Sequence, residues 1–444
     1  MINNVDFLNI PKVVTTKVHK VIDFEKPTTQ SIEAKLIATP YTCGRVDCCG
    51  SFVGHGVWRS RIKDTPVFGR PAVINLSMPR YKCKSAGHTF SLQPSEISFK
   101  HLVTIRAFEY VGFQALSRTV SEISTDTGIS RSVILKSFDN IVMLMDCFYK
   151  QKAPETLGID EAHLGGKYKA VFTDLDKNQV IDINESRSKD TIKKVISSFH
   201  GFENIKYVSM DMCEAYRDAV KEVIPNATIV IDKRHVLEYA RKAMDEERKK
   251  IWRKIKNKKN NPIKNNLKRI RQLLNSRKDK LKGDEIEEMK QLLSHYPALL
   301  QSYEQKERFN GIWAASNSKQ ARALYKNWKE NIPDKLTSTF AAVANLFKDW
   351  GDYIFSYFDT KDRIIKKRIT NAYTESANRI IKEIYRRGRG NNEFWRFRAK
   401  VLHKLGPWTE REIRDTIGIE HTLMLRYDLS FFEAIFGKIT ESHK

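Results

Sequence analysis

The chain has 444 residues, which is too long for one ordinary hydrophobic core and predicts roughly two to four domains. Its 41% hydrophobic content excludes a largely disordered chain, and its six cysteines exclude a disulfide-built scaffold. With 78 Lys and Arg against 53 Asp and Glu, the net charge is +25, a large and unevenly spread excess.

The positive charge is concentrated in three stretches, at residues 246–283, 361–368 and 379–398. Basic surface of this density suits a phosphate polymer, because each neutralised phosphate releases condensed counterions. The alternative is a soluble basic protein with solvated helix faces, which clustering makes the weaker interpretation. No apolar run reaches membrane-spanning length and the N-terminus lacks a signal-peptide pattern, so we expect a cytoplasmic protein.

The first hundred residues contain a candidate zinc site. Residues 1–40 carry little pattern and are predicted to form an N-terminal arm, whereas residues 41–95 hold two groups of soft ligands next to glycines. Zinc takes four Cys or His ligands, and paired groups supply two each. We favour a zinc-ribbon-like module over a small β module without metal, with the choice between the two adjacent cysteines open. The candidate ligands are Cys43, Cys48, Cys49, Cys83 and His88.

Residues 96–150 are predicted to form a helix-turn-helix domain. The stretch 119–134 reads as a helix, a turn at Gly128, a serine cap and a second helix. The second helix can enter a DNA major groove, with Ser130, Arg131 and Lys136 near its exposed side. Helical hairpins of this kind also occur in proteins that bind no DNA, but the net charge favours DNA binding.

Residues 151–240 alternate strands and helices. Three antiparallel strands, at 156–160, 169–175 and 179–183, precede two alternations of helix and parallel strand, as in a ribonuclease H-like sheet. Asp160 lies on the first strand, where a carboxylate is costly unless it is solvated, paired or bound to metal. Asp211 ends a later strand, although it could instead serve as an acid at a helix N-terminus.

His235 follows the last of these strands in the run Asp232-Lys-Arg-His235. It could orient or protonate a group near bound metal ions. The alternative is that Asp232 caps a helix while His235 packs against the sheet. Both interpretations stay open at this point.

The second half of the chain is predicted to be helical. Residues 241–360 form a long insertion that separates the sheet from a further acidic site in residues 361–405. There a helix capped by Thr370 or Asn371 carries Glu375, which could also be only a capping acid. Residues 406–444 are predicted to be a helical tail. The candidate DNA-binding residues on and after the Glu375 helix are Lys382, Arg386, Arg387 and Arg389.

Three carboxylates that are far apart in sequence can together hold two divalent ions about 3.5–4 Å apart. Magnesium suits such a site because it prefers carboxylates, waters and phosphate oxygens. A centre of this kind cuts and rejoins phosphodiesters by in-line displacement. Asp160, Asp211 and Glu375 are therefore the candidate metal ligands.

Several stretches of the chain resemble the DDE transposases of bacterial insertion sequences, in particular the ISL-three family. The resemblance covers roughly residues 40–405, and the order of the parts is more specific than any one motif. The stretches that carry it are Leu157–Glu161, Ser209–Met212, Ala215–Arg217, Asp232–Val236, Asn371–Lys382 and Arg386–Asn391.

The resemblance implies a multidomain α/β plus α protein, with a ribonuclease H-like catalytic sheet split by the helical insertion. It implies Asp160, Asp211 and Glu375 as catalytic acids with magnesium or manganese, and His235 as a further site residue. The implied partners are double-stranded DNA, as terminal inverted repeats and target, and further copies of the chain in a dimer or larger assembly near the nucleoid.

Two alternatives to a transposase stay open. One is a DNA-binding regulator that keeps the zinc module and helix-turn-helix but no longer cuts. The other is a ribonuclease H-like nuclease or resolvase that cleaves branched DNA or RNA hybrids without specific ends.

Overall fold

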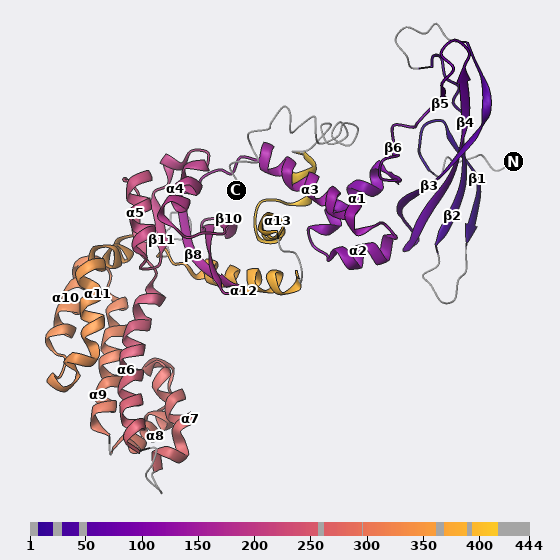
Figure 1. Cartoon of the computed structure of the whole chain (residues 1–444). Helices are drawn as coiled ribbons and strands as arrows, with labels where there is room; N and C mark the ends of the chain where they lie inside the picture. Colours follow the sequence, from indigo (N-terminus) through magenta and orange to yellow (C-terminus); the bar gives the residue numbers. More distant parts are fainter. Residues whose placement is uncertain are drawn as a thin grey trace. The chain divides into compact units, whose positions relative to one another are not determined.

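The computed structural model describes residues 8–20, 29–43, 51–255, 262–294, 296–360, 368–388 and 393–415 (Figure 1). The chain divides into two compact units, one drawn from residues 1–150 and 384–444 and the other from residues 151–383. The hydrophobic clusters of the two units share no residue among those described. Among the described helices, none has the length and apolar character needed to cross a membrane.

A seven-stranded sheet occupies the N-terminal part of the first unit (Figure 1). Its longest strands, β3 (Phe52–Val67) and β4 (Arg70–Cys83), form a hairpin whose turn has left-handed backbone at Phe68 and Gly69. The strand order is β1-β2-β4-β3-β7-β6, with β5 paired to β4. The other strands are β1 (Val13–Lys20), β2 (Gln30–Leu36), β5 (Thr89–Ser91), β6 (Ile97–Ser98) and β7 (Val103–Thr104).

The prediction of an N-terminal arm is wrong for residues 13–20 and 30–36, which form strands of this sheet. β1 pairs antiparallel with β2, and β2 lies parallel to β4 with Ile32 opposite Ile74. Ile32, Ala34 and Leu36 are buried while the residues between them are not, which is the alternation of a half-buried strand. Because every second residue of β2 is polar, its mean hydropathy is low and the strand is easily overlooked in the sequence.

Three helices follow the first sheet: α1 (Ile105–Ala115), α2 (Val120–Thr127) and α3 (Arg131–Phe148). Thr119 and Glu122 cap α2 reciprocally, and Gly128 ends it with a φ of 65° that glycine adopts at little cost. Ser130 then begins α3 from extended backbone. The helix, glycine turn and helix predicted for residues 119–134 are therefore present.

A helix from the C-terminal part of the chain completes the first unit. In α13 (Phe394–Leu405), the guanidinium of Arg396 lies 2.8 Å from Asp139 on α3, and that of Arg398 lies 2.7 Å from Asp146. These ion pairs hold α13 along α3. The predicted C-terminal tail lies largely outside the described residues, which end at 415.

The second unit contains a five-stranded sheet with the order β10-β9-β8-β11-β12. β8, β9 and β10 are antiparallel neighbours, whereas β11 is parallel to both β8 and β12. This mixed arrangement has the three antiparallel strands and two parallel strands that the sequence predicted. The strands are β8 (Thr156–Leu164), β9 (Lys167–Asp174), β10 (Gln179–Asn184), β11 (Tyr207–Met210) and β12 (Thr228–Ile231), connected by α4 (Lys189–Ser198) and α5 (Glu214–Val223).

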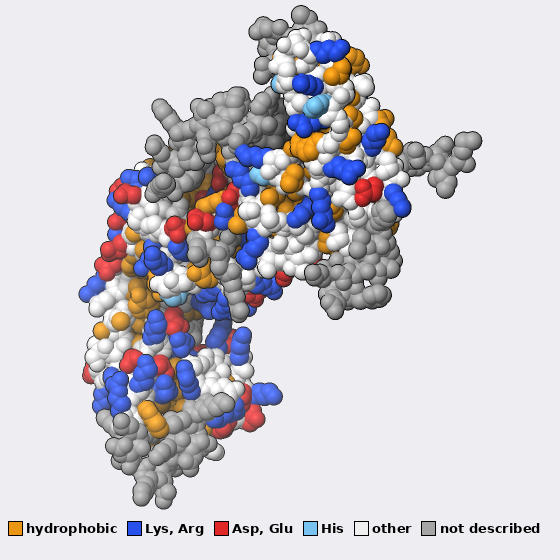
Figure 2. All heavy atoms as spheres, turned by 45° about the vertical axis from the view of Figure 1, so that its right-hand side comes forward, with side chains coloured by type: hydrophobic (Ala, Val, Ile, Leu, Met, Phe, Trp, Pro, Cys, Tyr) orange, Lys and Arg blue, Asp and Glu red, His pale blue; other side chains and the backbone are white. Residues whose placement is uncertain are grey.

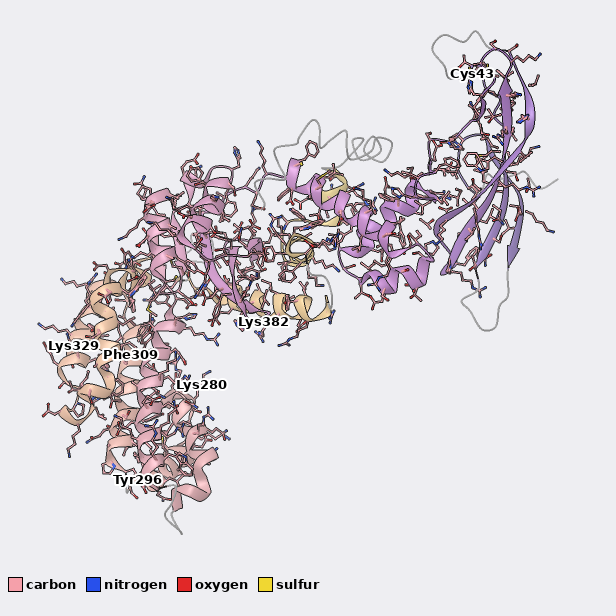
Figure 3. The ribbon with its side chains drawn as sticks, viewed as in Figure 1. Cys43, Lys280, Tyr296, Phe309, Lys329 and Lys382 are labelled. Atoms are coloured by element: carbon pink, nitrogen blue, oxygen red, sulfur yellow. The ribbon has the colours of Figure 1, made fainter. Side chains whose placement is uncertain are left out.

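The helices that follow belong to the same compact unit as this sheet, except for the end of α12 from Ile384 onward, which belongs to the first unit. Ser356 Oγ on α11 donates to the carbonyl oxygen of Ile229 on β12 at 2.6 Å, and Phe309, labelled in Figure 3, shares one core with the sheet. A smaller core, against which Tyr296 packs, lies further from the sheet. The helices are α6 (Lys233–Ile255), α7 (Pro262–Asn275), α8 (Gly283–Leu293), α9 (Pro297–Gly311), α10 (Ser318–Glu330), α11 (Asp334–Asp359) and α12 (Ala372–Arg387), with single 3₁₀ turns at Phe202–Asn204, Lys278–Lys280 and Ile312–Ala314.

Candidate functional site

Three aspartates stand in one row across the second sheet. Met210 on β11 lies opposite Ile159 on β8 and opposite Ile231 on β12. Neighbouring strands lie about 4.8 Å apart, and residues at the same level of parallel strands point the same way. The residues that come next on the three strands therefore bring their side chains together, and these are Asp160, Asp211 and Asp232.

Two overlapping groups of possible metal-ligand atoms surround this row. The donor atoms of Asp160, Asp211 and His235 all lie within 4.8 Å of one another, and so do those of Asp232, His235 and Glu375. His235 belongs to both groups, and its Nε2 lies 2.9 Å from Asp211 Oδ1. Residues from β8, from the ends of β11 and β12, and from α6 and α12 therefore meet at one place.

Two of these carboxyl groups are almost fully buried. Asp160 and Asp232 are each 5% exposed. Burial, and then the nearby charge of Asp211, raise the pKa of Asp160 to about 7. Burial likewise raises the pKa of Asp232. Burial by itself lowers the pKa of His235, but its hydrogen bond to Asp211 and the surrounding carboxylates outweigh that effect and raise it.

Asn378 ties α12 to the strand that carries Asp160. It lies one helical turn after Glu375, and its Nδ2 donates to Asp160 Oδ2 at 2.9 Å and to the backbone oxygen of Glu161 at 3.3 Å. The backbone N–H of Glu161 donates to Asp160 Oδ1 at 2.8 Å. Both carboxylate oxygens of Asp160 are thus held in place by neutral donors.

The first turn of α12 packs against Gly158 on β8. A Cβ added to Gly158 would lie 2.2 Å from Thr173 Oγ1 and 2.9 Å from both Asn371 Oδ1 and Thr374 Oγ1. Thr374 hydrogen-bonds Thr173 at 2.7 Å and Asn371 at 2.6 Å. The missing side chain of Gly158 therefore lets the helix carrying Glu375 approach the sheet closely.

Two arginines contact acids at the site. Arg234 forms an ion pair with Glu375, and its side chain is 73% exposed. Arg187 Nη1 lies 2.5 Å from Glu161 Oε2, an oxygen that also accepts from the hydroxyl of Tyr216 at 3.4 Å. Exposed positive charge therefore lies at the edge of a cluster of acids.

The four residues singled out in the sequence occupy this place: Asp160, Asp211 and His235 in one group and Glu375 in the other. Asp232 does act as the helix cap considered above, because its Oδ1 accepts from the backbone N–H of Arg234 at 2.9 Å. The sequence alone did not predict that Asp232 belongs to a donor group, nor that Asn378 contacts Asp160. The position of Asp232 directly after a strand parallel to that of Asp211 was the signal for it.

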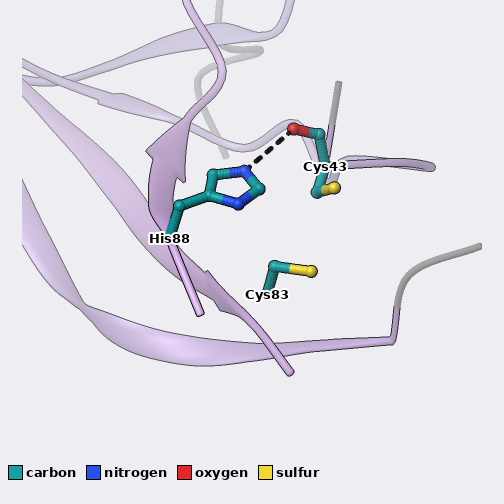
Figure 4. A group of neighbouring side chains, drawn as sticks. All are labelled: Cys43, Cys83 and His88. Atoms are coloured by element: carbon teal, nitrogen blue, oxygen red, sulfur yellow. Dashed lines mark hydrogen bonds between the residues drawn. The ribbon is translucent and has the colours of Figure 1, made fainter. Parts of the chain in front are cut away.

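Cys43, Cys83 and His88 form a separate cluster in the first unit (Figure 4). Their donor atoms lie within 4.8 Å of one another, and both cysteines are buried and free of disulfides. His88 Nε2 lies 3.4 Å from the carbonyl oxygen of Cys43, while its buried Nδ1 has no hydrogen-bond partner in the described structure. The backbone N–H of Ala86 donates to Cys83 Sγ at 3.4 Å. Cys48 and Cys49 lie outside the described residues.

The predicted DNA-binding residues lie on two helices. Ser130 and Arg131 are exposed at the start of α3 and Lys136 is half-buried further along it. On α12, Lys382 (Figure 3) is half-buried, and Arg386 and Arg387 are exposed near the end of the helix. Arg389 lies outside the described residues. Figure 2 shows Lys and Arg side chains spread over much of the visible face.

Comparison with known proteins points to a transposase. The model of the ISL-three (ISL3) family of DDE proteins, described as transposase, matches residues 157–401, which include the donor groups. The chain is also 22% identical over 347 residues to the transposase for insertion sequence element IS1001 of Bordetella parapertussis. That similarity covers 77% of this chain and 83% of the relative.

The chain belongs to the ISL-three family of DDE transposases. It is a transposase of an insertion sequence, and family membership implies an enzyme that cleaves DNA and transfers strands.

Proposed function

We propose that this transposase binds the terminal inverted repeats of its element and moves them by two-metal-ion chemistry. Asp160, Asp211 and Glu375 are the proposed metal-binding acids. The observation that carries the proposal is the pair of overlapping donor groups, because their members come from distant parts of the chain and share His235. The five-stranded sheet with its antiparallel and parallel halves supports a ribonuclease H-like assignment.

The residues present suit magnesium or manganese. Carboxylate oxygens are the ligands that these hard cations prefer, and buried acids such as Asp160 need a compensating positive charge. Asn378 Oδ1 is buried without a hydrogen-bond partner in the described part of the chain, so an unused oxygen acceptor remains beside Asp160. When bound, two such cations would stabilise the attacking and leaving oxygens of an in-line displacement at phosphorus.

The remaining residues of the site hold the acids in position or neutralise the charge of the DNA. Asn378 fixes the orientation of Asp160, and His235 fixes that of Asp211. Arg234 is exposed at the edge of the site, where a guanidinium can form paired hydrogen bonds with a phosphate of the substrate. We therefore assign Asn378 and His235 to positioning the acids, and Arg234 to binding the DNA.

For DNA binding, we assign α3 to the major groove of the terminal repeats, through Ser130, Arg131 and Lys136. Lys382, Arg386 and Arg387 on α12, with Arg389 beyond it, are assigned to the phosphate backbone. The net charge of +25 and the exposure of Arg131, Arg386 and Arg387 support these assignments. We expect a dimer or larger assembly, because two element ends must be held together.

The direct test incubates the full-length protein with magnesium and linear DNA that carries the element ends, and maps nicks to single nucleotides. We expect cleavage at the element boundary, no cleavage in EDTA, and none on DNA with scrambled ends. Binding to the ends without cleavage under magnesium or manganese would indicate a silent regulator. Cleavage of branched DNA or RNA hybrids without the ends would indicate a nuclease or resolvase instead.

We further propose that Cys43, Cys83 and His88 bind zinc. Two sulfur donors and one imidazole nitrogen within 4.8 Å suit its tetrahedral preference. The hydrogen bond from His88 Nε2 to a carbonyl oxygen leaves Nδ1 for the metal, as in many zinc sites. The fourth ligand falls to Cys48 or Cys49, both outside the described residues.

Replacing Cys83 by Ser is expected to remove bound zinc and to lower the melting temperature of the protein, because a structural zinc contributes directly to folding. The measurement is metal content by mass spectrometry, with about one zinc ion per chain expected in the wild type. Cys147→Ser, at a partly buried cysteine outside the cluster, is the control. Wild-type protein that lacks zinc after purification without chelators would contradict this assignment.

A further inference from the structure

A row of three basic residues follows one face of β3. Arg59, Arg61 and Lys63 occupy alternate positions, while Ile62 and Asp64 between and after them are buried on the opposite face. The residues opposite the row on β4 are Ser77, Asn75 and Val73, none of them acidic. The row therefore has no acidic neighbour directly across the hairpin.

An acid does share this face of the sheet two strands away. Glu33 on β2 lies opposite Asn75, and its carboxylate accepts from Asn75 Nδ2 at 2.6 Å. That hydrogen bond engages Glu33 with the amide rather than with an arginine. Arg61 and Lys63 line the same pocket, and burial, followed by the nearby charge of Arg61, lowers the pKa of Lys63.

The row leads into a pocket of about 400 Å³ that lies beside the helix-turn-helix. Its polar lining comes from Arg61, Lys63, His101 and Ser130, and none of the described residues that line it is acidic. The ring of His101 is stacked on Phe108 at a centroid distance of 5.4 Å. The rest of the wall is aliphatic and consists of Val73, Leu102, Val103, Ile129 and Val133.

Hydrogen bonds connect the strand that lines this pocket to neighbouring parts of the first unit. The Lys63 ammonium group donates to the carbonyl oxygen of Gly128, in the turn before α3, which leaves further N–H donors on the same nitrogen. Buried Asp64 accepts from Thr104 Oγ1 at 2.6 Å and from Arg106 Nε at 2.8 Å, where α1 begins. β3 is thus bonded both to the turn before α3 and to the start of α1.

We propose that this pocket binds a phosphate of the DNA backbone next to the groove that α3 enters, with Arg59 contacting the phosphate that follows. The inference rests on the proposed DNA binding by α3 and deepens it. Arginine and lysine around a pocket whose described lining holds no acid suit a phosphate, and the aliphatic wall suits the adjoining sugar. Since the turn before α3 forms part of the wall, a phosphate held there sets the position of that helix on the duplex.

The test measures duplex binding by fluorescence anisotropy over a series of salt concentrations, with the full-length protein. Arg61→Gln is expected to weaken binding to terminal-repeat and unrelated duplexes by a similar factor. It is also expected to lower the slope of log affinity against log salt by about one, because one phosphate contact is lost. Arg59→Gln combined with it is expected to lower the slope by about two.

Two variants serve as controls. Arg61→Lys keeps the charge and is expected to retain most of the salt slope, which a structural role of the guanidinium would not allow. Lys82→Gln removes an exposed charge from β4 at nine residues beyond Val73, which is about 30 Å along the strand, and is expected to leave the slope unchanged. Circular dichroism and thermal melting confirm that each variant is folded.

The outcomes separate the pocket from the wider function. Wild-type protein that binds no duplex overturns both proposals. Wild-type binding with Arg61→Gln indistinguishable from Lys82→Gln overturns the pocket alone. A third result would also overturn the pocket proposal alone. In it, inorganic phosphate raises the melting temperature of the wild type but not of Arg61→Gln, while the salt slope of DNA binding is equal in the two proteins. That result would assign the pocket to a free anion.

Discussion

Replacing Asp160, Asp211 or Glu375 by its amide counterpart is expected to reduce DNA cleavage and strand transfer by at least about 1,000-fold. The amide keeps the shape of each side chain but cannot neutralise a bound cation. Binding to terminal-repeat duplexes is expected to stay within about twofold of the wild type, because none of the three acids is itself a proposed DNA contact. The measurements are nick mapping, strand-transfer yield and manganese affinity by titration calorimetry.

Asp218→Asn is the matched control, since Asp218 is an acid of the same unit that pairs with Arg217 on α5 and belongs to neither donor group. Asp232→Asn addresses the fourth carboxylate: asparagine still caps α6 through its oxygen, so only a metal-binding role predicts weaker manganese affinity. If the variants of all three proposed acids still cut at the element boundary, the metal-centre proposal is wrong.

Replacing Gly158 by Ala is expected to abolish most of the cleavage activity without changing any charge at the site. Its Cβ would lie 2.2 Å from Thr173 Oγ1 and 2.9 Å from both Asn371 Oδ1, just before α12, and Thr374 Oγ1 in its first turn, so we expect α12 to be displaced. Glu375 and Asn378 move with α12, and displacement of a reacting group by about 1 Å can cost about 100-fold in rate. Overpacking of this kind also costs about 1–3 kcal/mol of stability.

Cleavage assays and chemical denaturation measure the two effects of Gly158→Ala. Gly283→Ala is the control, because no atom of the described residues lies within 4 Å of a Cβ added there, and Gly283 is distant in sequence from the acids of the site. Adding Thr173→Ala removes the closest clashing atom and is expected to restore part of both stability and activity. Full cleavage activity in Gly158→Ala would show that cleavage does not require the close packing of α12 against β8.

The strands and helices around the acids were predictable from sequence because their signals are local. About a dozen residues of sequence are enough to recognise each of three elements: the apolar run that contains Asp160, the strand that ends before Asp211 and the basic helix around Glu375. The glycine turn at Gly128 and its flanking caps are equally local. Family resemblance joined these pieces into one expectation.

The parts that were missed depend on which segments meet. β1 and β2 are half polar, so only the pairing of β1 with β2 and of β2 with β4 reveals them as strands rather than an arm. Asp232 reads as a helix cap until the parallel register of β11 and β12 brings it level with Asp211. Asn378 reads as one polar residue of an amphipathic helix until its amide is found on Asp160.

The sequence by itself determined the kinds of elements, the acids that end or interrupt the strands, and the family. Only the tertiary structure decided which acids share donor groups and that α12 packs closely against Gly158. It also decided that Arg61 and Lys63 face the turn before α3. The physical reason is that periodicity and capping act over a few residues, whereas register and helix docking depend on packing between segments that many residues separate.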